Sequence, residues 1–351
     1  MNAGARLTSA PGHGSIGRMK TSAHDNLFEN LSGWLCALLF LAASPFPGTP
    51  ARASEVPQVR TQAPGFYRMM LGDFEVTVLL DGTMAQPVDK LVSKPDEVRK
   101  VLARDHETLP IDLSVNAFLI NTGRNLVLVD AGVGELFGPK VGGQLPANLR
   151  AAGYKPGEID AVLITHLHGD HFGGLVAGGQ RAFPNAVVYL DKRETAYWLD
   201  ADQEKAAPEN RKRSFGQARA VLGQYAGAGK LQTFDGASEL FPGIRSMPAY
   251  GHTPGHTAYL VESRGERLLM WGDVIHCAEA QFHDPGLTMQ YDSDPRAAAA
   301  TRRSLMAAAA KDGWIVGSAH ISFPGLGHVR SDGRGYSWIP LPYSVPKPDV
   351  K

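Results

Sequence analysis

The sequence has little cysteine and no excess of charge of either sign. It contains two cysteines, and 35 basic residues balance 35 acidic residues over a length of 351. Without a strong overall field, the chain has no general attraction for nucleic acid or for an anionic membrane surface. The expected partner is therefore a small, weakly polar substrate molecule, and a homodimer is compatible with the sequence.

The cysteines leave no internal disulfide once an expected leader has been removed. Cys36 lies in that leader, so Cys277 would remain alone in the mature chain. Because a lone thiol is compatible with either redox environment, the cysteine content does not indicate a compartment. The expected role of Cys277 is that of a small buried hydrophobic residue.

The N-terminal region lacks a hydrophobic run long enough to span a membrane. Residues 34–43 are apolar, but such a run of about ten residues is half of the roughly twenty that a span needs. Lys20 precedes it and Ala51-Arg52-Ala53 follows it, a pattern typical of a cleaved signal peptide. We expect residues 1–53 to be a leader and 54–351 to be one domain, periplasmic or secreted. The alternatives are a short membrane anchor or, if the leader is not functional, a cytoplasmic protein.

Strand patterns and helix patterns each occur twice along the chain. Runs rich in β-branched and aromatic residues predict strands at 66–70, 74–80, 116–121, 126–130, 159–164, 186–190, 257–262, 267–270 and 314–316. Helices are expected at 145–152, from Lys192, at 214–225 and at 295–311. This order predicts an αββα sandwich, in which two mixed β-sheets pack face to face with helices on both outer faces. The proline-rich tail from Gly335 is expected to be an extended strap.

A His-rich run, Thr165-His-Leu-His-Gly-Asp-His-Phe-Gly-Gly174, follows the strand predicted at 159–164. His166 and His168 point the same way if the strand continues, whereas Asp170 and His171 come after the turn. Imidazole nitrogens and carboxylates are ligands of zinc and of neighbouring divalent metals. An open catalytic site needs about three protein ligands for one ion, so this segment is expected to contribute to two sites.

Three downstream loops offer further ligands for a second ion. They carry His252, Asp273 and His320, each at the end of an apolar segment or at a glycine-rich turn. An isolated histidine at a strand end is more often a hydrogen-bonded core residue than a ligand. The His-rich run together with a Gly-His-Thr-Pro-Gly-His loop favours the metal site over that alternative.

With these motifs the sequence resembles the metallo-β-lactamase-fold superfamily. The shared pattern is Thr-His-x-His-x-Asp-His, a Pro-Gly-His-Thr-Pro-Gly-His-type loop, a Gly-Asp pair and a final histidine, and the match runs from Phe66 to Trp338. The resemblance implies that one ion is bound by His166, His168 and His252, and the other by Asp170, His171 and His320, with Asp273 bridging them.

The same resemblance separates ligands from supporting residues. The first histidine of the glycine-rich loop is the ligand in this pattern, so His252 is chosen over His256, although Tyr250 stands where a proline is usual. Asp130 would accept a hydrogen bond from a ligand imidazole and fix its tautomer, and His256 would support the ligands without binding metal. From local sequence alone, Asp130 is equally well a turn residue. The implied cofactor is a pair of divalent ions, with zinc expected and manganese, cobalt or iron as alternatives.

Two divalent ions about 3.5–4 Å apart can share a hydroxide that attacks the substrate while the metals stabilise the developing oxyanion. Asp170 and Asp273 are the expected catalytic residues, as candidate proton relays. The sequence lacks a Gly-x-Ser-x-Gly nucleophile elbow, so a serine hydrolase is not indicated. The expected activity is hydrolysis of an ester-type bond in an apolar substrate.

Within the superfamily, the sequence is most similar to the methyl parathion hydrolase branch. The similarity rests on the stretch 136–139, on the spacing of the distant ligands and on the segments 323–330 and 335–340. It implies an organophosphate triester, an aryl ester or a lactone as substrate, with Phe137, Trp198 and Phe215 lining the leaving-group pocket. Ordinary core packing is the alternative role for each aromatic residue.

Other activities remain open at the level of sequence. A lactonase of the acyl-homoserine type, a thioesterase or a β-lactamase would use the same fold and ligands. An iron-dependent redox enzyme and a non-catalytic binding protein are further alternatives. The complete set of seven ligands favours a two-metal hydrolase over both.

Overall fold

The computed structural model describes residues 56–138 and 140–345. The predicted leader, residues 1–53, lies outside the described residues, so its cleavage and export stay predictions. The described residues from Arg60 onward belong to one compact unit, and every element described below lies in this unit. Within the described part of the chain, no helix is long and apolar enough to cross a membrane.

The first half of this unit forms a seven-stranded mixed sheet in the order β1-β2-β3-β4-β5-β8-β9. Its strands are β1 (Phe66–Leu71), β2 (Phe74–Gln86), β3 (Ile111–Asn121), β4 (Leu126–Val129), β5 (Ala161–Leu163), β8 (Val187–Asp191) and β9 (Leu231–Phe234). The first four are antiparallel, and β4, β5, β8 and β9 are parallel. The β1–β2 turn needs Gly72, because its φ is 56° and a Cβ atom there would clash with the Ser263 carbonyl.

The second half forms another seven-stranded sheet, in the order β10 to β16. Its strands are β10 (Glu239–Phe241), β11 (Ile244–Pro248), β12 (Thr257–Ser263), β13 (Glu266–Met270), β14 (Ile315–Gly317), β15 (Leu326–Ser331) and β16 (Tyr336–Pro340). Only the pair β13 and β14 is parallel among these strands. The tail expected to be an extended strap from Gly335 instead forms the edge strand β16, which ends at Pro340. An edge position tolerates proline because its missing N–H faces away from the ladder.

The core between the two sheets follows from alternation along the strands. On β2 and β3, Val76, Val78 and Ile120 pack against residues of the second sheet such as Tyr259 and Met270. Their neighbours in sequence point to the opposite face, because side chains alternate along a strand.

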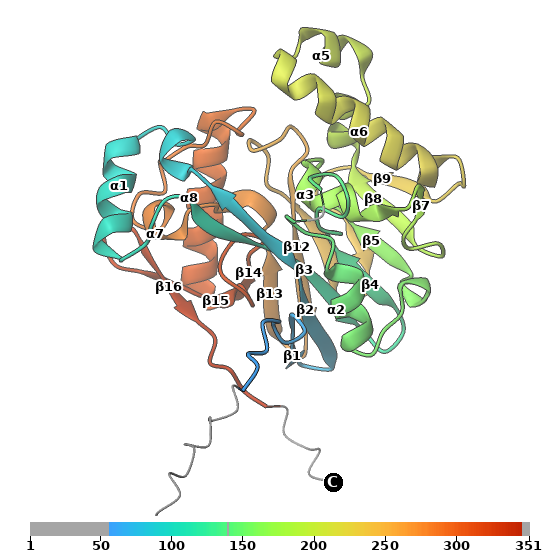
Figure 1. Cartoon of the computed structure of the whole chain (residues 1–351), viewed down its shortest axis with the longest axis horizontal. Coiled ribbons are helices and arrows are strands. Elements are labelled where there is room, and N and C mark those ends of the chain that lie inside the picture. Colours follow the sequence, from blue (N-terminus) through green and yellow to red (C-terminus); the bar gives the residue numbers. More distant parts are fainter. Residues whose placement is uncertain (1–55, 139, 346–351) are drawn as a thin grey trace, which may run out of the picture. The chain divides into compact units, whose positions relative to one another are not determined.

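Helices cover the outer faces of both sheets. They are α1 (Pro95–Arg104), α2 (Leu145–Ala151), α3 (Gly169–Phe172), α4 (Lys192–Trp198), α5 (Ala201–Ala206), α6 (Glu209–Ala226), α7 (Ala278–Gln281) and α8 (Pro295–Asp312). Figure 1 shows α2 and α6 beside the first sheet and α8 beside the second. The predicted αββα sandwich is confirmed.

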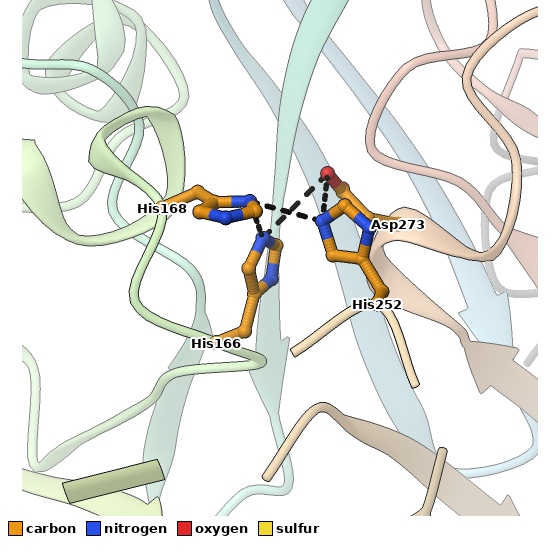
Figure 2. Close-up of side chains that lie close together, drawn as sticks. All are labelled: His166, His168, His252 and Asp273. Carbon is orange, nitrogen blue, oxygen red and sulfur yellow. Dashed lines mark hydrogen bonds and ion pairs between the residues drawn. The ribbon is translucent and has the colours of Figure 1, made fainter. Parts of the chain in front are cut away.

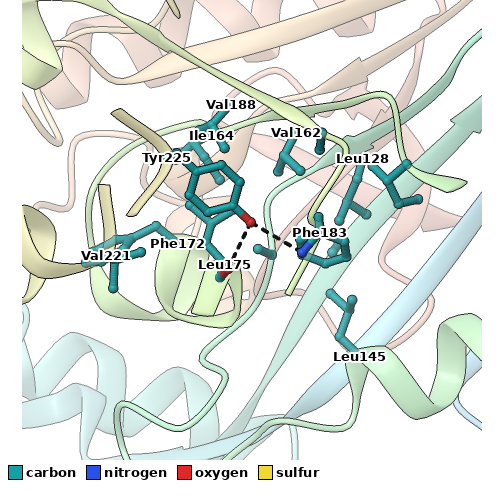
Figure 3. Packing of buried hydrophobic residues seen from close by; sticks show 14 of the residues in the cluster. Leu128, Leu145, Val162, Ile164, Phe172, Leu175, Phe183, Val188, Val221 and Tyr225 are labelled. Atoms are coloured by element: carbon teal, nitrogen blue, oxygen red, sulfur yellow. Dashed lines mark hydrogen bonds between the residues drawn. The ribbon is translucent and has the colours of Figure 1, made fainter. Parts of the chain in front are cut away.

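The outer core of the first sheet also supports the His-rich segment. Leu145 of α2, Val221 of α6 and Phe172 of α3 pack with strand residues in one cluster (Figure 3). The Tyr225 hydroxyl on α6 donates to the Leu175 carbonyl oxygen at 2.9 Å, directly after α3. The helix layer therefore holds the segment that follows β5.

Candidate metal centre

The candidate ligands lie on loops that follow strands of both sheets. His166 and His168 come between β5 and α3, and Asp170 and His171 are the second and third residues of α3. The distant three lie between β11 and β12 (His252), directly after β13 (Asp273) and directly after β14 (His320). Because β13 and β14 are parallel neighbours, their carboxyl ends bring Asp273 and His320 to one edge of the second sheet.

The first cluster consists of His166, His168, His252 and Asp273, whose donor atoms lie within 4.8 Å of one another. His168 Nδ1 is 3.0 Å from His166 Nε2 and 2.9 Å from His252 Nε2. Oδ2 of Asp273 lies 3.3 Å from His252 Nε2 and 3.6 Å from His166 Nε2. Figure 2 shows the three rings and the carboxylate turned toward one another.

The second cluster consists of Asp170, His171 and His320, also within 4.8 Å. Oδ1 of Asp273 lies 3.0 Å from His171 Nε2 and 3.1 Å from His320 Nε2. Asp170 Oδ2 is 3.5 Å from His171 Nε2 and 3.4 Å from His320 Nε2. Asp273 therefore turns one oxygen to each cluster, which is the placement that a bridging carboxylate requires.

The tautomers of the histidines fit cation binding. His320 Nδ1 lies 2.9 Å from the Ser114 carbonyl oxygen, which can only accept, so this nitrogen carries the proton. Nδ1 of His252 and of His171 likewise face carboxylates, those of Asp292 at 3.0 Å and Asp130 at 2.9 Å. In the neutral form of each ring, the Nε2 atom that faces the cluster then carries a free lone pair, as metal ligation needs.

The polar groups of the centre are buried and lack enough protons to satisfy one another. His171 Nε2 and Asp273 Oδ1 have no hydrogen-bond partner within the described residues. Burial, followed by the neighbouring His171, holds the pKa of His166 well below its ordinary value, so the ring is neutral. Burial opposes ionisation of Asp273, but His171 and His320 hold its pKa well below the usual range. Burial opposes protonation of His171, His252 and His320, but the nearby carboxylates raise their pKa, that of His252 to about 9. A bound cation would displace these protons. Imidazoles and carboxylates in this arrangement suit zinc and similar divalent ions, so the residues fit two such ions.

The two predicted supporting residues lie directly behind the ligands. Asp130 accepts hydrogen bonds from the Thr165 backbone and hydroxyl as well as facing His171. His256 accepts from the Asp273 backbone N–H at 3.0 Å and faces the Ala249 carbonyl with Nδ1. Burial lowers the pKa of His256 to about 3, so it stays neutral and keeps its tautomer.

Three polar residues of the centre were not predicted from the sequence. His276 Nε2 lies 3.0 Å from Asp273 Oδ2, and its ring stacks on that of His320 at 5.5 Å. Asp292 faces His252, and the buried Glu194 accepts hydrogen bonds from both ligand loops. The position of His276 three residues after Asp273 was a usable local signal, whereas the two carboxylates have none.

A cavity of about 370 Å³ opens onto the clusters and touches His168, Asp170, Asp273 and His320. Met84, Leu91 and Leu113 contribute to its apolar wall, and residues of the first turns of α6 line it as well, among them Arg211.

The three aromatic residues expected in the pocket differ in position. Phe137 and Trp198 line the cavity; Phe137 is 45% exposed and Trp198 only 2%. The Trp198 ring meets that of His168 edge-on at 5.7 Å. Phe215 does not line the cavity: it is fully buried, with its ring 4.7 Å from that of Trp198. The apolar face of α6 turns Phe215 into the core, so it supports Trp198 from behind.

Comparisons with known proteins agree with this architecture. A family model described as the metallo-beta-lactamase superfamily matches residues 110–320. The crystal structure of the hydrolase AbOPH is 33% identical with a TM-score of 0.77, covering 81% of this chain and all of that one. The lactonase AidC, described as dizinc and quorum-quenching, is 27% identical with a TM-score of 0.74, covering 80% of this chain and 99% of its own.

Curated relatives match over a smaller part of their length. An N-acyl homoserine lactonase of Bacillus cereus is 25% identical over 202 residues, which is 52% of this chain and 72% of the relative. An atrochrysone carboxyl ACP thioesterase of Passalora fulva is 29% identical over 220 residues, covering 60% of this chain and 54% of the relative. The finer resemblance to the methyl parathion hydrolase branch stays a prediction. By its fold, its ligand-bearing loops and the family match, the chain belongs to the metallo-beta-lactamase superfamily.

Proposed function

We propose that this protein is a two-metal hydrolase that opens lactones and cleaves related apolar esters. The observation that carries the proposal is the pair of ligand clusters sharing Asp273 at the floor of an apolar-walled cavity. When bound, two divalent ions, proposed to be zinc, would supply a water-derived nucleophile at neutral pH and polarise the substrate oxygen.

The chain's own residues would bind the substrate and keep the ligands oriented. Met84, Leu113 and Trp198 offer an apolar wall beside the ligands, which suits an acyl chain or an aryl group and excludes water. Asp170 lines the same cavity with its side chain 12% exposed. Its pKa is held low by His171 and His320 against the effect of burial. It is therefore an ionised carboxylate, as a metal ligand needs to be, and its position at the cavity makes it our candidate proton relay once metal is bound.

The relatives support lactones as the first substrate class. The relative from Bacillus cereus is described as an N-acyl homoserine lactonase, and AidC as a lactonase in complex with an acyl-homoserine product. Such substrates combine a polar lactone ring with an apolar chain. The cavity offers the matching arrangement, with polar ligands at the floor and apolar side chains on the wall.

Aryl phosphotriesters are the second candidate class. The observation that favours them is the aromatic pair Phe137 and Trp198 on the cavity wall, which suits a flat aryl leaving group. Both classes would use the same ligands, and the wall would contact the apolar chain of a lactone or the aryl leaving group of a phosphotriester.

A hydrolysis panel tests the proposal. Metal-free and zinc-reconstituted protein would be assayed with an N-acyl homoserine lactone, an aryl ester, an acyl thioester and an aryl phosphotriester. We expect zinc-dependent turnover, with kcat/KM highest for the lactone, and its loss in Asp273→Asn. Turnover highest for the phosphotriester would shift the assignment to the second class. No metal-dependent turnover of any of the four would contradict the proposal.

A further inference from the structure

A buried carboxylate outside the ligand set joins the two loops that carry the histidines of the first cluster. Glu194, on α4, is 1% exposed. Its Oε1 accepts from the Leu167 backbone N–H at 2.8 Å and from the Trp198 indole at 2.7 Å. Its Oε2 accepts from the Thr253 hydroxyl at 2.7 Å and from the Gly255 backbone N–H at 2.8 Å.

The partners of Glu194 are the chain neighbours of ligands. Leu167 separates His166 from His168, and Thr253 directly follows His252. One side chain therefore fixes the backbone on both sides of the first cluster, although 84 residues separate His168 from His252 in sequence.

The loop that carries His252 packs closely on α4. A Cβ atom at Gly255 would lie 2.3 Å from the Glu194 backbone nitrogen and 2.7 Å from its Cβ. Such approaches are far inside van der Waals contact, so only glycine lets the loop reach the carboxylate. The contact brings two loops of different sheets to one fixed separation.

The hydrogen bonds around Glu194 suit its ionised form. Burial raises its pKa, while the hydrogen bonds from Leu167, Thr253, Gly255 and Trp198 lower it in turn. The Leu167, Gly255 and Trp198 N–H groups can only donate, and the Thr253 hydroxyl also donates in this arrangement, so the four hydrogen bonds suit an ionised carboxylate. No ion pair with a cationic side chain is recorded for Glu194 within residues 56–138 and 140–345. A buried charge without a cationic partner is costly, and bound metal cations would offset that cost.

We propose that Glu194 is a positioning residue that sets the spacing of His166, His168 and His252 and thereby the affinity of the first metal ion. It acts through the ligand loops and touches neither metal nor substrate. Because the same oxygen holds both Leu167 and Trp198, it also fixes the cavity wall relative to His168. The inference rests on the proposed two-metal site.

The test compares Glu194→Gln with a matched control, Asp81→Asn. Asp81 is also fully buried and accepts from the backbone N–H groups of Val133, Gly143 and Leu145, none of which adjoins a ligand in sequence. Glutamine keeps the size of Glu194 but replaces one acceptor with an amide that meets a donor. Each protein would be stripped of metal and titrated with zinc against a chromophoric chelator, and cobalt-substituted samples would be compared by their visible spectra.

In Glu194→Gln we expect the affinity for one ion to fall about 10- to 100-fold, the range for supporting residues of metal sites. The second ion, held by Asp170, His171 and His320, should bind as in the wild type, and the cobalt spectrum should change for one site only. Asp81→Asn should lower the melting temperature and leave both affinities unchanged. Wild-type affinity for both ions in Glu194→Gln would overturn the inference, as would an equal loss at both sites.

A milder variant keeps the test decisive if Glu194→Gln does not fold. Thr253→Val removes one of the four hydrogen bonds and retains the shape of the side chain. We expect a smaller, site-specific loss of affinity for the same ion, and an unchanged affinity would again overturn the inference. Failure of the wild-type protein to bind two ions would contradict the proposed two-metal function instead, so the two failures are distinguishable.

Discussion

Asp292→Asn should weaken binding of the first metal ion through His252. The carboxylate faces His252 Nδ1 at 3.0 Å and accepts from the Met289 backbone N–H at 2.9 Å, with its side chain fully buried. Asparagine offers one acceptor for these two donors. Either a buried donor loses its partner, or His252 moves its proton to Nε2, the nitrogen that faces the cluster.

The size of the effect follows from the hydrogen bond that is lost. A hydrogen bond to a charged group contributes about 1.5–3 kcal/mol. Because about 1.4 kcal/mol corresponds to a factor of ten in affinity, the first ion should bind roughly 10- to 100-fold more weakly. The second ion should be unaffected, since no ligand of its cluster contacts Asp292 by any hydrogen bond recorded for the described residues.

A zinc competition titration of metal-free protein measures this change directly. The control is Asp284→Asn, in the same loop region, whose side chain bonds Lys94 and the Gly286 backbone instead of a ligand. We expect both ions to bind Asp284→Asn as they bind the wild type. If Asp292→Asn also bound both ions with wild-type affinity, the tautomer argument for His252 would be refuted.

Three further predictions concern the core, the thiol and the cavity. Tyr225→Phe removes the hydroxyl that donates to Leu175 and accepts from Phe183, so we expect the unfolding free energy to fall by about 1–3 kcal/mol. The melting temperature should be lower and the activity at 25 °C retained. An unchanged melting temperature would contradict this prediction. Burial raises the pKa of Cys277 to about 12, so a thiol reagent at pH 8 should leave this residue unmodified in the native protein. Peptide mass spectrometry measures the modification, and rapid labelling would show that the thiol is accessible. Phe137→Ala shortens the side chain of a half-exposed cavity residue. It should raise KM about fivefold with little change in kcat, as expected for the loss of roughly 1 kcal/mol of apolar contact with the substrate. A fivefold fall in kcat would show instead that Phe137 acts in the chemical step.

The ligands that belong to short local motifs could be predicted from the sequence. The run from His166 to His171 begins in the loop after β5 and ends within α3. Its spacing and its glycine turn already indicate two sets of ligands. His252, Asp273 and His320 each end a recognisable apolar strand or turn. For that reason the αββα layers and the set of metal ligands could be predicted from the sequence.

The remaining features depend on contacts between distant segments. Glu194 and Asp292 are ordinary acidic residues in sequence, and only the fold brings them beneath ligand loops 27 and 40 residues away. Phe215 was expected in the pocket from the resemblance to the methyl parathion hydrolase branch, and helical spacing alone does not say which side of α6 meets a cavity. The edge strand β16 contains Pro340 and follows a turn, so its pattern resembles that of an irregular tail.

Two ions that share the Asp273 carboxylate are proposed to make the protein a hydrolase. The rate of N-acyl homoserine lactone hydrolysis should be measured while metal-free protein is titrated with zinc. We expect no activity without metal, full activity at two zinc ions per chain, and no recovery in Asp273→Asn at the same occupancy. Full activity in the metal-free protein, or a purified protein that contains a single iron per chain and hydrolyses no ester, would contradict it.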